Sequence, residues 1–331
     1  MAGGVTAALL AGGAWAYGLG WELRRRAYAR GVLGQVGAGL RVVSVGNLTV
    51  GGTGKTTLCL HLARRALERG IEAGVVCRRY RPGPRGEGDE ERLYLDALGS
   101  SRVFAGAVKR RLARAAAAAG MRLAIVDDGF SHWRLARDVD IVLLDAHDLW
   151  GGGELLPAGR LREPLRALQR AHALVVTRLG PGEDPAPWIA ASRPYAPGAL
   201  TAAGRHRVIG VRDLDGVGRA AGGAARVVTA TGSPEAVARS ATEAGFEVLG
   251  VSRYRDHHWF GDAEAAIELA RAAAAGAALL LTAKDAVRWP AAARDPRVAV
   301  LEVAWEWVCG GDAVERLAFG AAEAAWTSPT S

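Results

Sequence analysis

The sequence predicts an α/β protein in which parallel strands alternate with helices and are divided between two domains. Short apolar, β-branched runs recur between helical stretches along the chain, the pattern of a parallel sheet covered on both faces. The chain has 331 residues, more than one compact core usually holds. Five of its 13 prolines lie within residues 181–197, which predicts a loop or linker there.

The first predicted strand, residues 41–45, is β-branched and stops at Gly46. The same reasoning gives the remaining elements of the first domain. We predict strands at 73–77, 123–126, 139–144 and 174–177, and helices at 56–69 and 108–119. In the second, smaller domain we predict strands at 226–229, 247–251, 278–282 and 298–303, again alternating with helices.

The amino-terminal segment carries no charged side chain over residues 1–21, and Arg24, Arg25 and Arg26 follow it. Its length permits a membrane span, but six glycines lower its hydrophobicity. Arginines on its carboxyl side favour a cytoplasmic location for the rest of the chain. We therefore expect a membrane-associated helix in residues 1–35, inserted shallowly or peripherally. The alternative is a helix packed on the protein's own core. The other expected domains are residues 36–200 and 201–331.

Residues 46–57, GNLTVGGTGKTT, lie between a predicted strand and a predicted helix, the context that a phosphate-binding P-loop requires. The glycines allow backbone N–H groups to surround phosphates at the start of the helix. Lys55 is expected to reach the β- and γ-phosphates of ATP, and the Thr56 hydroxyl to ligate Mg²⁺. The strict pattern has glycine in place of Thr49. The predicted nucleotide-binding residues are Thr49, Val50, Gly51, Gly52, Thr53, Gly54, Lys55 and Thr56.

The P-loop also resembles that of dimerising partition-type ATPases, which carry a lysine where this chain has Val50. The absence of that lysine disfavours this class.

Acidic residues end the predicted strand at 123–126, where a P-loop fold holds Mg²⁺ or its water. Asp127 and Asp128 fit that role, although one of them could instead be a helix N-cap. Asp145 ends another strand but has no carboxylate beside it, so it is a weaker candidate.

Two further groups could carry chemistry. Asp89 and Glu90 are adjacent carboxylates that could bind metal or accept a proton, although a solvated loop is the simpler interpretation of their spacing. In the segment Asp256-His257-His258, carboxylate and imidazole could orient one another, but such a group is more often structural.

The net charge is +8, which suits an anionic partner, although solvated arginines account for most of it. We expect no nucleic-acid partner.

Together these motifs resemble the tetraacyldisaccharide 4′-kinase (lipid A 4′-kinase) family. Besides the P-loop, the matching segments are CRRYR from Cys77, GDE from Gly88, DDGFSHWRLARD from Asp127, LLPAGRLREP from Leu155, TGSP from Thr231, DHH from Asp256 and TAKDAVR from Thr282. The chain departs from the family pattern at Cys77, Arg79, Ser131 and Ala283.

The resemblance implies an enzyme that uses ATP and Mg²⁺ to phosphorylate the 4′-hydroxyl of a tetraacyldisaccharide 1-phosphate, a glycolipid, at the cytoplasmic face of the bacterial inner membrane. It also implies an active-site cleft between two α/β domains. Asp89, oriented by His257, would accept the hydroxyl proton, and Asp128 is the alternative base. Lys55 would stabilise the transferring phosphoryl group. The implied metal ligands are Thr56, Asp127, Asp128 and Glu90.

Two other functions remain open from the residues alone. One is a membrane-associated P-loop ATPase switch, and the other is a soluble small-metabolite kinase.

Overall fold

The computed structural model describes residues 2–80, 82–83 and 86–324, and its chain forms two compact units. Unit 1 comprises Met1–Cys77, Ser101–Arg205 and Trp307–Ser331. Unit 2 comprises Arg78–Ser100 and His206–Glu306. Both units are discontinuous in sequence, unlike the expected linear division at residue 200. Residue 1 and residues 325–331, at the ends of the expected domains, lie outside the described part of the chain.

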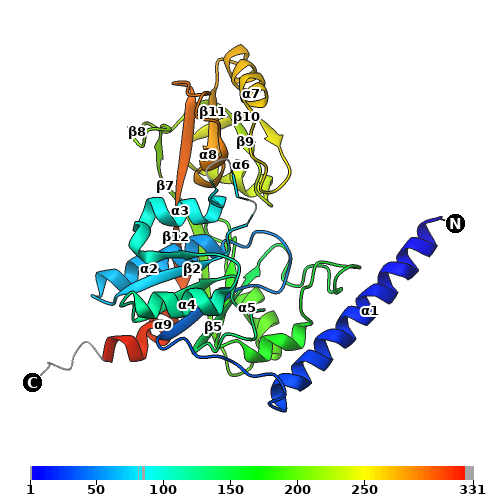
Figure 1. The fold of residues 1–331 in the computed structure, drawn as a ribbon. Helices are drawn as coiled ribbons and strands as arrows, with labels where there is room; N and C mark the ends of the chain where they lie inside the picture. The colour runs from blue at the N-terminus through cyan, green and yellow to red at the C-terminus, as the bar shows by residue number, and fades with distance from the viewer. Residues whose placement is uncertain (1, 81, 84–85, 325–331) are drawn as a thin grey trace, which may run out of the picture. The chain divides into compact units, whose positions relative to one another are not determined.

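Unit 1 contains a parallel sheet whose strand order is β6-β5-β1-β4-β2-β3. The first strand of the chain is therefore near the centre, with β4 on one side and β5 on the other. Figure 1 labels two of these strands, β2 and β5. The strands are β1 (Arg41–Gly46), β2 (Ala73–Cys77), β3 (Val103–Ala105), β4 (Leu123–Asp127), β5 (Val139–Asp145) and β6 (Ala173–Thr177). Apart from those of β3, which are half-buried, their residues are almost all buried, which explains the continuous apolar runs in the sequence.

Helices α2 (Lys55–Glu68) and α4 (Lys109–Ala118) confirm the two helices expected in this part of the chain. The prediction of a loop or linker at 181–197 was wrong in part, because this stretch contains the helix α5 (Ala186–Ser192). Proline is tolerated in the first turn of a helix, where its missing N–H has no helical partner. Trp188 and Ile189 of α5 pack against buried residues of unit 1.

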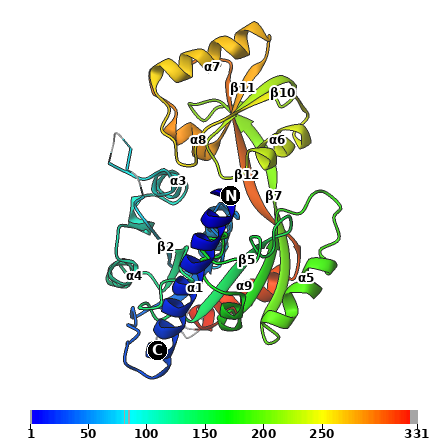
Figure 2. The ribbon, with the colours of Figure 1, turned by 90° about the vertical axis from the view of Figure 1, so that its right-hand side faces the viewer.

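Unit 2 has its own parallel strands in the order β10-β9-β11-β12. Figure 2 shows α7 and α8 on one side of these strands and α6 on the other. Two apolar clusters fill the two faces. The strands are β9 (Gly223–Thr229), β10 (Phe246–Arg253), β11 (Ala278–Thr282) and β12 (Val298–Cys309), and the helices are α3 (Asp89–Leu98), α6 (Pro234–Glu243), α7 (Asp262–Ala274) and α8 (Ala283–Arg288).

Strand β7 (Leu200–Arg212) begins in unit 1, where it pairs with β6, and ends in unit 2, where it pairs with the short β8 (Gly218–Arg219). Strand β12 runs the other way and leads into α9 (Gly311–Ala324), which packs on β1 of unit 1.

Glu315 of α9 ties the end of the chain to unit 1. Its side chain is only 3% exposed and lies 2.9 Å from His61 Nε2 and 2.8 Å from Arg69. Trp307 Nε1 also donates to it, at 3.1 Å. Burial raises the pKa of Glu315, but the hydrogen bonds from His61 and Trp307 outweigh it and bring the pKa to about 2. The carboxylate is therefore charged at neutral pH and holds α9 against α2.

Helix α1 (Ala2–Ala29) extends along the loops that follow β5. Tyr17 donates to the carbonyl oxygen of Arg162 at 2.7 Å, and Trp21 donates to Glu163 at 3.0 Å. The helix is therefore attached to unit 1 through its second half. In the described part of the chain, no helix combines the length and apolarity needed to cross a membrane.

Candidate active site

The P-loop connects β1 to α2 at the carboxyl edge of the unit 1 sheet. Gly54 has φ 86°, a left-handed conformation that favours glycine, and the helix starts at the next residue, Lys55. A second segment runs antiparallel beside the loop: Val50 N–H donates to the Arg160 carbonyl at 2.8 Å, and Arg162 N–H donates to the Leu48 carbonyl at 2.7 Å. This pairing places the arginines of the LLPAGRLREP segment next to the P-loop.

Thr49, where the strict motif has glycine, is accommodated by a glycine elsewhere. A Cβ on Gly151 would lie 2.5 Å from the Thr49 Cγ2 methyl, and Gly151 also has a positive φ of 58°. The absent side chain of Gly151 leaves room for the extra bulk at residue 49. The departure from the strict pattern therefore leaves the loop intact.

Asn47 joins the charged groups of the P-loop. It is fully buried, and its Oδ1 accepts from Lys55 Nζ at 3.1 Å and from Arg162 at 2.5 Å. Its Nδ2 donates to the Thr49 carbonyl at 2.9 Å. The Lys55 ammonium is thus held over the loop, where a phosphate chain would bind.

The structure brings together two of the expected metal ligands. Thr56 Oγ1 donates to Asp127 Oδ2 at 3.4 Å, and Asp127 ends β4 next to β1. A hydroxyl and a carboxylate are oxygen ligands of the kind that Mg²⁺ takes in phosphate sites, where phosphates and water fill the other positions. Among the described residues no three His, Cys, Asp or Glu side chains gather as a metal site. The pair fits Mg²⁺ held jointly with a nucleotide.

Asp128 is held differently from Asp127. It has φ 52°, unusual for a residue other than glycine, and Lys109 Nζ donates to the carbonyls of Asp127 and Asp128 at 2.5 and 2.7 Å. Arg162 donates to both carboxylate oxygens of Asp128, at 2.8 and 2.7 Å. Burial raises the pKa of Asp128, but the hydrogen bonds from Arg162 and the charge of Lys55 lower it far below its usual range. Asp128 is therefore a fixed anion beside the P-loop.

A second charged cluster lies within unit 2. Asp89 is the first residue of α3 and is only 2% exposed, so the interpretation of this segment as a solvated loop was wrong. His257 Nδ1 lies 2.9 Å from Asp89 Oδ2. We expected these residues to come from two different domains, but both belong to unit 2. Their hydrogen bond therefore requires no closure of one unit on the other.

Two cations of α8 complete this cluster. Lys284 Nζ lies 3.7 Å from Asp89 and 3.1 Å from Glu90, and the fully buried Arg288 lies 3.4 Å from Asp89. Burial raises the pKa of Asp89, but the hydrogen bond from His257 and the charges of Lys284 and Arg288 bring it to about 2. Glu90, an expected metal ligand, thus pairs with Lys284 in unit 2, whereas Asp127 and Asp128 belong to unit 1.

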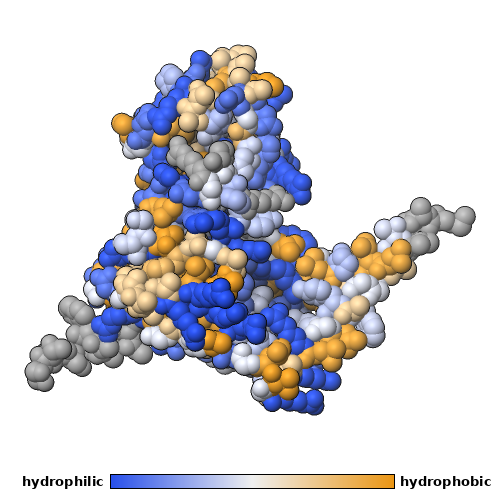
Figure 3. All heavy atoms as spheres, in the orientation of Figure 1, coloured by the Kyte–Doolittle hydropathy of each residue, from blue (hydrophilic) through white to orange (hydrophobic). Residues whose placement is uncertain are grey.

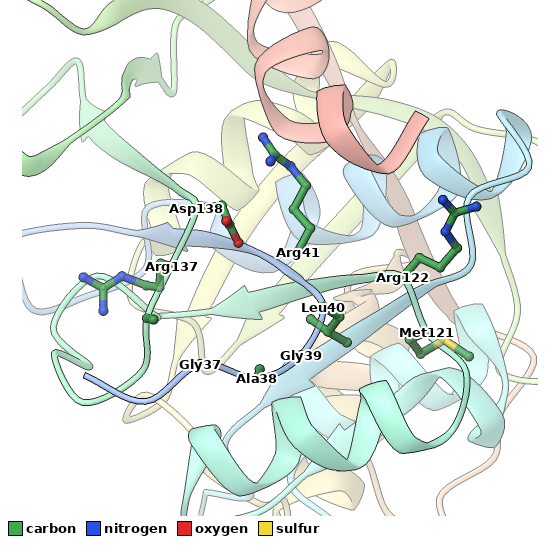
Figure 4. A pocket seen from close by; sticks show the side chains of 10 residues that line it. Gly37, Ala38, Gly39, Leu40, Arg41, Met121, Arg122, Arg137 and Asp138 are labelled. Atoms are coloured by element: carbon green, nitrogen blue, oxygen red, sulfur yellow. The ribbon is translucent and has the colours of Figure 1, made fainter. Parts of the chain in front are cut away.

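A cavity of about 640 Å³ lies at the opposite edge of the unit 1 sheet. Its lining residues lie at or just before the starts of β1, β4 and β5 and include Arg41, Arg122 and Asp138 (Figure 4). Ligands of open α/β sheets bind at the carboxyl ends of the strands. The cavity is therefore separate from the P-loop site.

Residues 6–318 match the family model of tetraacyldisaccharide-1-phosphate 4′-kinase. The chain belongs to this family. The resemblance based on its motifs is confirmed, and family membership makes the chain a kinase.

Individual members of the family support this assignment of the chain to the family. The chain is similar to tetraacyldisaccharide 4′-kinase of Anaeromyxobacter sp. strain Fw109-5, at 37% identity over 88% of this chain and 85% of the relative. It is 35% identical to that of Geobacter sulfurreducens, over 85% and 84% of the two chains. Its fold is similar to the crystal structure of LpxK from Aquifex aeolicus, an "apo" form in complex with ATP, with a TM-score of 0.70 at 23% identity, covering 95% and 99% of the chains. The P-loop-type α/β fold is therefore confirmed.

Several residues that shape both charged clusters of this 4′-kinase family member were not predicted from the sequence. They are Asn47, Lys109, Arg162, Lys284 and Arg288. One signal was available. The chain is rich in arginine, and its only lysines are Lys55, Lys109 and Lys284. Each of the three lies in one of the charged clusters, so the scarcity of lysine in the sequence indicated that these three were candidate site residues.

Of the departures from the family pattern, Arg79 is explained by an ion pair. Its guanidinium donates to Glu91 at 2.8 and 2.6 Å. Glu91 Oε2 also accepts from the Gly88 N–H at 3.2 Å, just before Asp89. Arg79 thus stabilises the first turn of α3 by holding Glu91 in place.

Proposed function

We propose that this chain transfers the γ-phosphoryl group of ATP to the 4′-hydroxyl of a tetraacyldisaccharide 1-phosphate in lipid A biosynthesis. One observation carries the proposal: the motifs that match the family supply every side chain of both charged clusters, around the P-loop and around Asp89, except Lys109. A P-loop ATPase switch would have no use for the second cluster.

The unit 1 cluster would bind and polarise the phosphates. Backbone N–H groups at the start of α2 and the Lys55 ammonium stabilise negative charge on the transferring group. Thr56 and Asp127 would hold Mg²⁺, which when bound neutralises charge between the β- and γ-phosphates. The Asp128 carboxylate accepts hydrogen bonds from Arg162, and its negative charge offsets part of the positive charge of Lys55 and Lys109.

The unit 2 cluster would receive the proton of the acceptor hydroxyl. The Asp89 side chain is buried, and its carboxylate already pairs with His257, Lys284 and Arg288. Little of its surface is therefore accessible to a substrate hydroxyl. In the neutral imidazole that donates its Nδ1–H to Asp89, Nε2 has a free lone pair and can accept a proton; this nitrogen lies 3.8 Å from Asp256 Oδ2. This geometry favours His257 as the acceptor and Asp89 as the residue that orients it, the reverse of the order implied by the resemblance.

We further propose that α1 holds the enzyme at the cytoplasmic face of the inner membrane, where an acylated substrate lies. The large apolar side chains Trp15, Leu19 and Leu23 recur every fourth residue, so they share one helix face. Their exposed fractions are 73%, 47% and 57%. Figure 3 shows hydrophobic residues along this helix. Arg24, Arg25 and Arg26 follow, where they can meet anionic headgroups.

Acidic residues on this face should release the protein from membranes. We expect the double variant Trp15→Glu/Leu23→Glu to sediment much less with anionic vesicles than the unmodified chain. Val217→Glu is the matched control, because Val217 is also 63% exposed but lies in unit 2. Equal vesicle binding by the double variant and the control would contradict a role for α1.

The activity itself is tested with ATP labelled at the γ-phosphate and three acceptors: the acylated disaccharide 1-phosphate, its deacylated form and none. Label on the acylated acceptor at the 4′-position supports the proposal. Label released only as free phosphate would indicate an ATPase switch instead. Label on soluble metabolites of a lipid-free cell extract, but not on the lipid, would indicate a small-metabolite kinase.

A further inference from the structure

Arg178 lies beside the P-loop and has no part in the phosphate and proton chemistry described above. It follows β6 directly and has φ 66°, a left-handed conformation that is costly for an arginine. One guanidinium nitrogen donates to Asp145 Oδ2 at 2.8 Å, and another donates to the carbonyl of Gly52 in the P-loop. The side chain is therefore stretched from the end of β6, past the end of β5, to the P-loop.

The loop that carries Arg178 is fixed on both sides. Leu179 is buried with Val176, Ala203 and Trp188, and the Gly180 N–H donates to Glu183 at 2.7 Å. The left-handed backbone of Arg178 is thus imposed by its surroundings. Strain of this kind persists where the surrounding structure holds it, and it is found most often at functional sites.

The strand order indicates which part of a nucleotide would meet Arg178. Thr56 and Asp127, the proposed metal ligands, would hold Mg²⁺ and the terminal phosphates on the β4 side of β1. A nucleoside occupies the opposite end of a phosphate chain. It must therefore leave the P-loop on the other side of β1, over the carboxyl ends of β5 and β6. Asp145 and Arg178 stand at those two strand ends.

We infer that the guanidinium plane of Arg178 forms one wall of the site for the purine base of the nucleotide. Asp145 and the Gly52 carbonyl bind the edge of the guanidinium and so fix its plane, and 17% of the side chain is exposed. Planar guanidinium groups stack on aromatic rings, which a lysine ammonium cannot do in the same way. Contact through the face is independent of the base's hydrogen-bonding edge, so this arginine would contribute affinity rather than choice between bases.

The inference rests on nucleotide binding by the P-loop and is tested by comparing two ligands in the presence of Mg²⁺: ATP, and inorganic tripolyphosphate, which lacks the nucleoside. For Arg178→Lys, which keeps a cation for Asp145 and Gly52 but loses the planar face, we expect ATP to bind about tenfold more weakly. Tripolyphosphate should bind as it does to the unmodified chain. Arg178→Ala should likewise weaken the binding of ATP and leave the binding of tripolyphosphate unchanged.

Arg160→Ala is the matched control. Arg160 also joins a carboxylate to a P-loop carbonyl, with Asp148 at 2.9 Å and the Val50 carbonyl at 3.1 Å. It should affect ATP and tripolyphosphate equally. If the Arg178 variants also weaken both ligands equally, or if Arg178→Lys binds ATP normally, the inference is overturned. Failure of the unmodified chain to bind either ligand would instead overturn nucleotide binding, and with it the proposed function.

Discussion

Replacement of Lys55 by alanine should reduce phosphoryl transfer by about 10³-fold, equivalent to about 4 kcal/mol of transition-state stabilisation. Lys55 Nζ has Asn47 Oδ1 as a hydrogen-bond partner at 3.1 Å, so its removal takes away the cation above the P-loop without opening the core. The measurement is kcat with labelled ATP and the acylated acceptor, together with the thermal unfolding midpoint.

Arg64→Ala is the control for this variant, because Arg64 is an exposed cation on the same helix. It should leave both kcat and the unfolding midpoint nearly unchanged. Turnover close to normal in Lys55→Ala would show that the P-loop does not act on the transferring group. An unfolded Lys55→Ala protein would leave Lys55→Met, which keeps the apolar stem, as the variant to assay.

Loss of either Asp89 or His257 should lower kcat by about 10²–10⁴-fold while leaving ATP affinity close to normal. The two side chains share a hydrogen bond of 2.9 Å inside unit 2, whereas the P-loop belongs to unit 1. If they act as one proton-accepting pair, the double variant Asp89→Ala/His257→Ala should be little worse than the poorer single variant. The measurement is kcat across pH for both single variants and the double variant.

The adjacent imidazole provides the control for the pair. His258 also pairs with a carboxylate, Glu264 at 2.8 Å, but that pair does not include Asp89. His258→Ala should therefore retain most of the activity. Losses that multiply in the double variant would argue that the two residues act independently. An active His257→Ala enzyme with an inactive Asp89→Ala enzyme would return the acceptor role to Asp89.

The strands and the P-loop were predictable because they depend on local sequence. The apolar runs that became β1, β4 and β5 are buried on both faces of a parallel sheet, so nearly every residue in them is constrained. Lys55 and Thr56 are placed by the turn from a strand to a helix, which the glycines encode. These positions need no knowledge of the rest of the chain.

The partners of the site residues were not predictable, because they come from distant segments. Arg162 reaches Asp128 from a loop that pairs with the P-loop, and Lys109 reaches the same turn from α4. Periodicity says nothing about such contacts. The grouping of residues 78–100 with unit 2 was missed for the same reason, since it depends on the packing of α3 against α8.

The return of β12 and α9 to unit 1 has a consequence for how the protein is made. A ribosome releases residues 206–306 before residues 307–324, and domains generally fold as their sequence emerges. All of unit 2 is therefore synthesised before unit 1 receives Trp307 and Glu315, the residues that fasten its last helix to α2. The nucleotide-binding unit begins first and is completed last. A chain that stops early loses part of that unit, so no shortening from the carboxyl end can remove unit 2 alone.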